Sequence, residues 1–579
     1  MTAPSTVADY LLQRLREWEV DKVFGTRGEG LAGLLAAWER SGNRPELVRG
    51  GHEESCAYQA VGYAKLSGRL GVCAASAGPG AIRLLTGLHE ARVDQVPILA
   101  VIGGTGRSEY GDDDDELYRQ TPDLVSRIRS VVGESVHVLT APEYLPGMLD
   151  RAIRGALTGR APSVVVIPAG MQSVLLPARA YEAMAKPSVV GFEWSSVLPA
   201  NFAIQRAAEV LNAGRRVAVL AGTGARGAHE EIEYVADLLG AGVAKSLPGK
   251  DVVSDDLPYV TGPIGPLGTR PSHELMNRCD TLLTVGFAAP PTRFLPRPGR
   301  VRAVQIDTDA RRIGTNHPNE VDLVGDAAAT LRALIPHLRG KEDRGWREDV
   351  EAKVRQWWQM VDTEAMAGAV LGAGAIPGSA PQRAFAELSA RLPDNAVVTA
   401  ESGALTAHYA RHLRFRGGMR GVLSGAASAA GSAMPLGLGA KMAFPGRPVI
   451  VLTDDTAMQA NGLAELITIK RQWTAWADPR LIVAVLRDAQ PLDVDYAPFV
   501  AGLGLRPIAV DASDHLGQAW DRALTADRPT LLDIRVESTS AASQGRDMRD
   551  TATGQPEPPD SGGAGLHALL PRQYRPFDS

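Results

Sequence analysis

Two short apolar runs that end in acidic side chains constrain this chain more than any other feature. Val449 to Leu452 leads into Asp454 and Asp455, and Leu481 to Leu486 leads into Asp488. A continuous apolar run of this length is typical of a parallel strand buried on both faces. Parallel strands bring their carboxyl ends to one edge, where open α/β sheets bind ligands. We therefore expect Asp454 and Asp488 to face one another across a crevice.

The acids at this edge allow two interpretations. Two carboxylates and a backbone carbonyl would suit a hard cation such as Mg²⁺ that holds a diphosphate. In the other interpretation the aspartates are ordinary caps of the helices that follow the strands. Asp455 or Asp488 taken alone fits this structural role better. The apolar runs therefore predict the strand edge, while the function of its acids stays open.

The length and charge of the chain limit its architecture and its partners. At 579 residues it is too long for one core, and we expect about three or four domains. Its 61 basic and 66 acidic side chains give a net charge of −5, which favours neither nucleic acid nor a membrane as a partner. No apolar run is long enough to cross a bilayer. Cys56, Cys73 and Cys279 lack metal or disulfide spacing, so we expect a reducing cytoplasm.

The first third of the chain alternates strands and helices. This alternation predicts a doubly wound parallel sheet. Gly28 falls in the loop after the first expected strand, and Ser76, Gly78 and Gly80 open the helix after the third. The expected strands are 22–24, 46–48, 70–75 and 97–102, and an expected helix spans 54–66.

A second α/β unit follows a polar connection at about residues 177–199. Its expected strands, which begin at residues 216, 281 and 303, run into Gly222, Gly286 and Asp307. A glycine at a strand end lets the backbone approach a phosphate, and an acid there can accept a ribose hydroxyl. This unit is therefore expected to hold a nucleotide. The alternative for Gly222 and Gly224 is a tight turn without a ligand.

These segments together predict an α/β fold of three doubly wound parallel-sheet domains. We place the first domain at 1–180, the central domain at 195–340 and the third at 365–540, followed by a polar tail at 541–579. The third domain contains the acidic strand ends and a stretch rich in Gly, Ala and Ser at 425–439. Such a stretch allows either close approach of the backbone to a ligand or tight helix packing.

Several different short motifs are spread along nearly the whole chain. They are Phe24–Gly28, His52–Glu54 with Gly62–Ala64, Ser76–Gly80, Asp94–Pro97, Gly249–Asp251, Gly286 with Phe294–Pro296, Gln305–Asp307 and Ala457–Gly462. In this order the motifs resemble those of the thiamine-diphosphate enzymes, in the group of pyruvate oxidase and acetolactate synthase and especially the pyruvate-oxidase-like branch. The resemblance implies a pyrimidine-binding first domain, a central domain of the FAD-binding type and a diphosphate-binding third domain. It also implies a homo-oligomer, a dimer or tetramer, because the cofactor of such enzymes lies between two chains.

The resemblance also implies the residues of each site. Glu53 would bond the pyrimidine ring of thiamine diphosphate and exchange a proton with it, whereas Glu54 fits an acid favoured by the helix dipole. Mg²⁺ would be held by Asp454, Asp488 and the carbonyl of Gln490. Implied contacts to thiamine diphosphate are Gly28, Ser76, Gly78, Gly80, Ala430, Asp455, Thr456 and Arg487, and those to FAD are Gly222, Gly224, Arg226, Gly286, Phe287, Asp307 and Asp326.

The third domain departs from the family pattern at several positions. Thr453-Asp454-Asp455 stands where the family has Gly-Asp-Gly, and Arg487-Asp488 replaces paired asparagines. The extra carboxylate of Asp455 would repel a diphosphate, and Arg487 is expected to compensate by pairing with Asp455 or with phosphate. Ala430 replaces a bulky residue that bends the cofactor. The segment after Asp488 lacks the usual insert that closes over it.

Two functions of different classes follow. The first is an enzyme that uses thiamine diphosphate and Mg²⁺ to decarboxylate a 2-oxo acid and pass the product to an acceptor, with FAD as a structural or redox partner. The second is a thiamine-independent member of the fold that keeps FAD, either as a flavin-dependent catalyst or as a non-catalytic partner subunit. Glu53 and Asp454 favour the first function. The changes at positions 430, 453, 455 and 487 favour the second.

Overall fold

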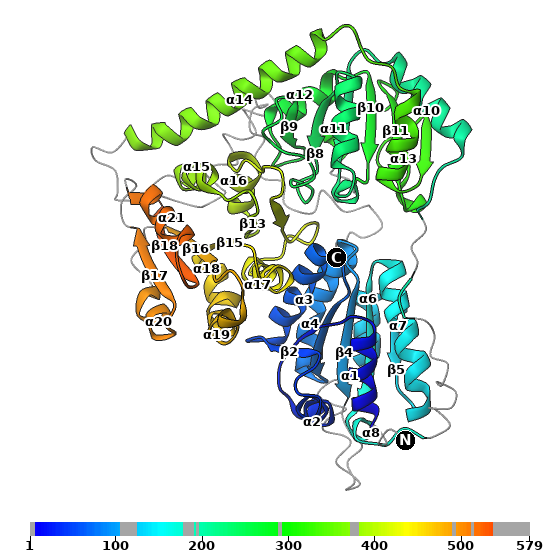
Figure 1. The fold of residues 1–579 in the computed structure, drawn as a ribbon. Coiled ribbons are helices and arrows are strands. Elements are labelled where there is room, and N and C mark those ends of the chain that lie inside the picture. Colours follow the sequence, from blue (N-terminus) through cyan, green and yellow to red (C-terminus); the bar gives the residue numbers. More distant parts are fainter. Residues whose placement is uncertain are drawn as a thin grey trace, which may run out of the picture. The chain divides into compact units, whose positions relative to one another are not determined.

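The structure of this chain is a computed structural model. It describes residues 6–104, 124–177, 190–192, 196–287, 292–370, 381–488, 494–510 and 515–536. These residues form three six-stranded sheets in which every strand pairs in parallel with its neighbours (Figure 1). The predicted α/β fold of three parallel-sheet domains is therefore confirmed.

The first sheet has the strand order β2-β1-β3-β4-β6-β5. From β1 the chain moves to one side to form β2 and then crosses to the other side to form β3. In such sheets ligands bind outside the carboxyl ends of the strands at this switch point. The strands are β1 (Lys22–Gly25), β2 (Glu46–Arg49), β3 (Gly71–Ser76), β4 (Ile98–Gly104), β5 (Val136–Val138) and β6 (Pro162–Pro168). The helices are α1 (Val7–Glu17), α2 (Ala32–Arg40), α3 (Glu53–Ser67), α4 (Pro79–Val93), α6 (Leu124–Val132), α7 (Leu145–Gly159) and α8 (Ala169–Gln172).

The third sheet repeats the strand order of the first, as β14-β13-β15-β16-β18-β17. Its switch point lies between β13 and β15, so the carboxyl ends of these two strands correspond to those of β1 and β3. The strands are β13 (Val397–Ala400), β14 (Arg420–Val422), β15 (Val449–Asp454), β16 (Leu481–Asp488), β17 (Arg506–Val510) and β18 (Thr530–Val536). The helices are α15 (Pro381–Arg391), α16 (Ala404–His412), α17 (Ala433–Ala443), α18 (Asp455–Ala457), α19 (Leu463–Gln472), α20 (Tyr496–Gly502) and α21 (Leu516–Leu524).

The central sheet has a different order, β12-β11-β10-β7-β8-β9. This is the order of dinucleotide-binding doubly wound sheets, with its switch point between β7 and β10. The strands are β7 (Val217–Ala221), β8 (Gly242–Lys245), β9 (Val260–Pro263), β10 (Thr281–Val285), β11 (Arg302–Asp307) and β12 (Val321–Val324). The helices are α10 (Asn201–Ala213), α11 (His229–Leu238), α12 (Arg270–Arg278) and α13 (Ala327–Leu334), followed by the long helix α14 (Gly345–Val370).

The apolar runs in the sequence form the cores of these sheets. In β15 the residues from Val449 to Leu452 are all buried, and the burial decreases at Asp454, where the strand ends. Side chains point to alternate faces of a strand, so an uninterrupted apolar run requires cover on both faces. The expected buried strand with an acid at its carboxyl end is confirmed.

Within the chain, the first and third domains pack through α3 and α17. A methyl group on Gly62 would lie 2.4 Å from the Leu436 carbonyl oxygen, and one on Gly439 would lie 2.1 Å from that of Gln59. The two helices can approach this closely because neither contact position has a Cβ atom. Of the two roles expected for the small residues at 425–439, tight helix packing is observed at Gly439.

Several expected features lie wholly or partly outside the described residues. The tail at 541–579 and Gln490 lie outside, as do most of the connection at 177–199 and residues 371–380 before the third domain. Among the helices that the structure describes, none has both the length and the apolar composition of a membrane span.

Candidate functional site

Glu53 is the first residue of α3 and lies at the carboxyl edge of the first sheet. His52 precedes it as the helix cap. The Glu53 carboxylate accepts a hydrogen bond of 2.9 Å from the hydroxyl of Thr26, which follows β1, and lies 3.4 Å from a guanidinium nitrogen of Arg83. Its side chain is 15 % exposed, so a ligand outside the strand ends can reach it.

The surroundings of Glu53 favour its charged form. Burial by itself raises the pKa of the Glu53 carboxyl, but the hydrogen bonds from its own backbone, Thr26 and Arg83 together lower that pKa below its ordinary value. A deprotonated carboxylate can accept a hydrogen bond from a ligand. The pKa of the neighbouring Glu54 is instead raised by burial. The two adjacent glutamates are therefore in different electrostatic environments.

The expected first-domain contacts lie after β1, at the end of β3 and at the start of α4. A methyl group on Gly80 would lie 3.2 Å from the Glu53 carboxylate oxygen, and one on Gly28 would lie 2.1 Å from the Ser76 hydroxyl oxygen. Gly78 caps α4 with a φ of 80°. The Ser76 hydroxyl is buried and has no hydrogen-bond partner among the described residues. An unpartnered buried hydroxyl at the end of β3 is a polar position that a ligand can satisfy.

In the third domain, Asp454 and Asp488 lie on neighbouring strands at the same edge. Asp454 is paired with Leu486 in the ladder between β15 and β16, and Asp488 follows two residues later. The Asp454 carboxylate caps α18 by accepting the Ala457 backbone N–H at 2.8 Å. The capping role is thus observed for Asp454, in addition to its position at the switch point. The side chain of Asp488 and all of Gln490 lie outside the described residues.

The carboxylate of Asp455 is bound by the third domain itself. One oxygen accepts a hydrogen bond from the Tyr496 hydroxyl, and the other accepts one of 2.6 Å from the Gln459 amide. The ring of Tyr496 is fully buried at the start of α20. These donors spread the charge of Asp455 but do not neutralise it. Thr456 is exposed beside it.

Arg487 has a carboxylate partner other than the expected Asp455. Its Nε and Nη2 atoms donate to the two oxygens of Asp533 at 2.6 and 2.8 Å. Asp533 lies on β18, the strand next to β16, and both side chains are almost fully buried. We expected Arg487 to pair with Asp455 or with phosphate. The structure shows a bidentate pair with a carboxylate of the neighbouring strand, and the pairing with phosphate stays a prediction.

Glu401 is a buried acid at this edge that the sequence analysis did not identify. It follows β13, on the other side of the switch point from Asp454. Its carboxylate accepts the backbone N–H groups of Ser402, Gly431 and Ala433 at 3.0, 3.0 and 3.2 Å. Burial raises the pKa of Glu401 to about 7, and the nearby Asp454 adds to this increase. Its position after an apolar strand, like that of Asp454, was the available sequence signal.

The bonds of Glu401 also fix the loop that contains Ala430. Ala430 is exposed and lies next to Gly431, whose N–H group binds Glu401. The hydroxyl of Ser432 donates to the Ala429 carbonyl at 2.7 Å. The fixed loop therefore presents only the methyl group of Ala430 where the family has a bulky side chain.

The expected FAD contacts in the central domain meet at the switch point of its sheet. Gly224 donates its backbone N–H to the Gly286 carbonyl at 2.9 Å. A methyl group on Gly222 would lie 2.2 Å from the same carbonyl and 2.4 Å from the Phe287 Cα. The loops after β7 and β10 therefore touch each other. This contact alone is enough to require glycine at positions 222 and 224. It agrees with the alternative of a tight turn that needs no ligand.

The polar members of the FAD group have partners within the chain. Arg226 pairs with Asp251 at 3.0 Å, and Asp326 caps α13 by accepting the Ala329 N–H at 2.9 Å. Asp307 accepts the Asp309 N–H at 2.9 Å, and burial raises the pKa of its carboxyl. The structure brings these residues to one edge but gives each a role that needs no flavin.

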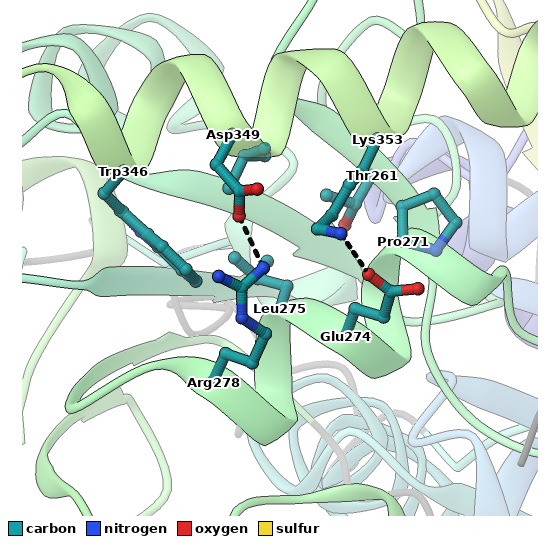
Figure 2. A pocket seen from close by; sticks show the side chains of 9 residues that line it. Thr261, Pro271, Glu274, Leu275, Arg278, Trp346, Asp349 and Lys353 are labelled. Carbon is teal, nitrogen blue, oxygen red and sulfur yellow. Dashed lines mark hydrogen bonds and ion pairs between the residues drawn. The ribbon is translucent and has the colours of Figure 1, made fainter.

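A shallow hollow lies away from these strand edges, between α12 and α14. Figure 2 shows that its charged side chains pair across it: Arg278 with Asp349 at 2.5 Å and Lys353 with Glu274 at 2.6 Å. The Arg278 guanidinium also lies over the Trp346 ring, 5.5 Å from its centroid. Because these charges satisfy one another, the hollow is a helix contact rather than a candidate ligand site.

No group of three or more His, Cys, Asp or Glu side chains among the described residues is arranged to hold a metal ion. This finding leaves open a site built from two carboxylates and a carbonyl, because the Asp488 side chain and all of Gln490 lie outside the described residues. The three cysteines are buried free thiols, and burial raises the pKa of each. None of them is placed as a thiolate ligand or nucleophile.

Two sheets of the same strand order, each with an acid at its switch point, and a third sheet of the dinucleotide-binding order define a multidomain α/β protein. Family models of the thiamine pyrophosphate enzymes match all three domains: the N-terminal TPP binding domain at residues 5–126, the central domain at 204–334 and the C-terminal TPP binding domain at 401–475. The chain belongs to the thiamine pyrophosphate enzyme family.

Similar proteins span nearly the full chain. YdaP of Bacillus subtilis, which bears the name of a thiamine pyrophosphate-containing protein, is 28 % identical over 547 residues, 92 % of each chain. Pyruvate oxidase of Lactiplantibacillus plantarum is 26 % identical over 550 residues, 91 % of this chain and 88 % of that protein. The acetolactate synthase large subunit of Parasynechococcus marenigrum is 25 % identical over 578 residues, 92 % of this chain and 88 % of that protein. The predicted family is therefore confirmed.

Proposed function

We propose that this protein is a thiamine-diphosphate-dependent enzyme that decarboxylates a 2-oxo acid and either transfers the remaining acyl unit to an acceptor or passes two of its electrons to an oxidant such as FAD. The observation that supports this most directly is the environment of Glu53. Its carboxylate is half-buried, favoured in the charged form and open at the switch point of a domain that matches the thiamine pyrophosphate enzymes. The relatives named for pyruvate oxidase and acetolactate synthase agree with this chemistry.

The residues at the first-domain edge fit a pyrimidine ring. The buried Ser76 hydroxyl lacks a partner, and Gly80 leaves room beside the Glu53 carboxylate. At the third-domain edge, Asp454 and Asp488 lie on adjacent strands, where two carboxylates and the Gln490 carbonyl would hold Mg²⁺. Thiamine diphosphate, when bound, supplies the electron sink for breaking the bond between the two carbonyl carbons.

The chain's own residues bind, orient and exchange a proton. Glu53 would face a ring nitrogen of the bound group and would accept a hydrogen bond and a proton from it when that nitrogen is protonated, while Thr26 and Arg83 hold the carboxylate in place. Glu401 fixes the loop around Ala430 by accepting the backbone N–H groups of Gly431 and Ala433. The single methyl group of Ala430 leaves space beside the reacting centre, which would admit a 2-oxo acid with a larger side chain.

A titration calorimetry experiment tests this function. Purified protein is titrated with thiamine diphosphate in the presence of Mg²⁺, and CO₂ release from a panel of 2-oxo acids is then measured. We expect saturable binding and release of CO₂ that requires both additions. Absence of heat at millimolar cofactor, together with absence of CO₂ release, would refute the proposal.

A second candidate function follows from the partners of the altered residues. Asp455 is bound by Tyr496 and Gln459, and Arg487 is bound by Asp533, so both departures are accommodated without a diphosphate. This supports a thiamine-independent member of the fold that binds FAD at the central switch point or serves as a partner subunit. An absorption spectrum with flavin bands after incubation with FAD, and no response to thiamine diphosphate, would favour it.

The oligomeric state belongs to the same proposal. We propose a homodimer or a dimer of dimers in which each cofactor lies between the first domain of one chain and the third domain of its partner. Light scattering should give at least twice the chain mass at micromolar concentration. A stable monomer that nevertheless binds thiamine diphosphate would contradict this arrangement.

A further inference from the structure

The turn that delivers Glu53 is held by a helix of the third domain. This turn, Arg49 to His52, joins β2 to α3. Its Gly51 donates a backbone N–H to the Glu465 carboxylate on α19 at 2.9 Å, and its Arg49 carbonyl accepts the Thr468 hydroxyl at 3.2 Å. A methyl group on Gly51 would lie 2.5 Å from the Ala464 Cβ. The turn and the helix are therefore in direct contact immediately before Glu53.

Glu465 is fully buried and makes several hydrogen bonds. Its second oxygen accepts a hydrogen bond of 2.9 Å from the side-chain amide of Gln59. Gln59 lies on α3, six residues after Glu53. Burial raises the pKa of the Glu465 carboxyl, and the hydrogen bonds from Gly51 and Gln59 oppose that increase. The carboxylate thus joins the turn before Glu53 and the helix α3 to the same residue of α19, and losing it would leave two buried donors without an acceptor.

The helix that holds the turn starts from the acidic edge of the third sheet. The chain runs from Asp454 through α18 and the π-helical turn η7 (Met458–Gly462) into α19. Short π-helical turns within α-helices are frequent at functional sites. One continuous segment thus begins at the proposed metal edge and ends in α19, the helix that contacts the turn before Glu53.

We propose that Glu465 is a positioning residue that fixes the Glu53 carboxylate through the Gly51 N–H and the Gln59 amide. It acts on the turn and on α3 at Gln59, and it is fully buried beneath them rather than placed to contact a ligand. A displacement of about 1 Å at a reacting group can cost about a hundredfold in rate, so fixing this turn matters for proton exchange. This inference rests on the function proposed for Glu53.

Two substitutions separate the hydrogen bonds of Glu465 from its volume. Glu465→Met keeps a side chain of similar size but leaves the Gly51 N–H and the Gln59 amide without an acceptor. Glu465→Gln can keep both contacts, because its oxygen accepts from Gly51 while its NH₂ group donates to the Gln59 oxygen after that amide rotates. That Gln59 oxygen is buried and has no partner among the described residues. Lys470→Gln, an exposed change on the same helix, is the matched control.

The first measurement needs no cofactor. Hydrogen–deuterium exchange is followed by mass spectrometry in a peptide that covers residues 49–56. We expect Glu465→Met to exchange at least about tenfold faster there, with exchange elsewhere unchanged. Glu465→Gln and Lys470→Gln should match the wild type. Unchanged local exchange in Glu465→Met would overturn the inference whether or not the protein uses thiamine.

The second measurement uses protein loaded with thiamine diphosphate and Mg²⁺. The rate at which the bound cofactor exchanges its thiazolium proton with solvent is followed by NMR after acid quench. We expect a loss of about ten- to a hundredfold in Glu465→Met with little change in cofactor affinity, and recovery in Glu465→Gln. Faster local exchange with an unchanged proton-exchange rate would show a purely structural contact and overturn the inference.

If Glu465→Met does not fold, Glu465→Asp replaces it in both measurements. Aspartate keeps the charge but is one methylene shorter, so it cannot reach Gly51 and Gln59 together. The same direction of change is expected, at smaller size, and wild-type behaviour in both measurements would overturn the inference. If no variant and no wild-type protein binds thiamine diphosphate, the proposed function fails, and the cofactor-free measurement still decides whether Glu465 fixes the turn.

Discussion

The hydroxyl of Tyr496 donates a hydrogen bond to the carboxylate of Asp455, which stands where the family has a glycine. The Gln459 amide binds the other oxygen of Asp455 at 2.6 Å. The extra carboxylate is therefore held in one orientation by two neutral donors, and its negative charge remains at the edge where a diphosphate would approach. Cofactor affinity should depend on both members of this pair.

Replacing Asp455 should change the affinity for thiamine diphosphate. We expect Asp455→Gly to bind about ten- to a hundredfold more tightly, because it removes a like charge from a partly dry site. Tyr496→Phe should bind about tenfold more weakly, since it leaves the Asp455 carboxylate less well screened. Calorimetric titration at constant Mg²⁺ measures both. Equal affinity in wild type and Asp455→Gly would place the diphosphate away from this residue.

Removing the charge of Glu53 should abolish turnover without unfolding the protein. We expect Glu53→Gln to lower kcat by about 10²–10⁴-fold, the usual contribution of a general acid or base. Its melting temperature should stay close to that of the wild type, because the Thr26 hydroxyl can still donate to the amide oxygen. Glu54→Gln is the matched control on the next residue. Full activity in Glu53→Gln would exclude the proposed role.

The glycines of the central domain can be tested separately from FAD. Gly222→Ala places a methyl group 2.2 Å from the Gly286 carbonyl oxygen, so the free energy of unfolding should fall by about 1–3 kcal/mol. Gly227→Ala is the control, because a methyl group there meets nothing within 4 Å. Denaturant unfolding without added flavin measures both. Stability that falls in Gly222→Ala only when FAD is present would instead assign the glycine to cofactor binding.

The buried pair of His408 and His412 on α16 predicts a pH dependence of stability. Burial lowers the pKa of His408 to about 4 and that of His412 to about 3. At pH values between these lowered pKa values and the ordinary 6.5, the two histidines bind protons in the unfolded chain but not in the folded chain. The free energy of unfolding should therefore fall as the pH drops below 6.5, by about 2 kcal/mol per histidine at pH 5.

Urea unfolding at pH 7.5 and at pH 5 measures this effect. His412→Leu keeps the site apolar and removes one of the two titrating groups, so its loss of stability between the two pH values should be smaller than that of the wild type. Lys470→Gln, which changes no histidine, should show the wild-type loss. An equal loss in His412→Leu would assign the acid sensitivity to carboxylates instead.

Much of the fold could be predicted from the sequence, because its signals are local. The apolar run from Val449 to Leu452 and the acid at position 454 indicate a buried parallel strand and its carboxyl end without reference to any other segment. The expected helix at 54–66 is α3 (Glu53–Ser67), and the expected strand at 22–24 is β1 (Lys22–Gly25). Each boundary is set by a neighbouring cap or glycine.

The candidate site could be predicted only in part. Glu53 and Asp454 were identified because each stands next to a strand or helix end in a family motif. Glu401 was missed, although it occupies the same kind of position, because only its bonds to Gly431 and Ala433 distinguish it from an ordinary cap. The pairing of Arg487 with Asp533 was not predicted, because no local pattern indicates that β18 lies beside β16.

The sequence by itself determined the class of fold, the family and the edge at which each acid emerges, since these follow from periodicity and from motifs of a few residues. Only the tertiary structure decided the partner of each polar group. Asp455 meets Tyr496 across 41 residues, and Glu465 meets Gly51 across 414. Such contacts depend on strand order and helix packing, because a buried charge binds whichever donor the fold places within about 3 Å.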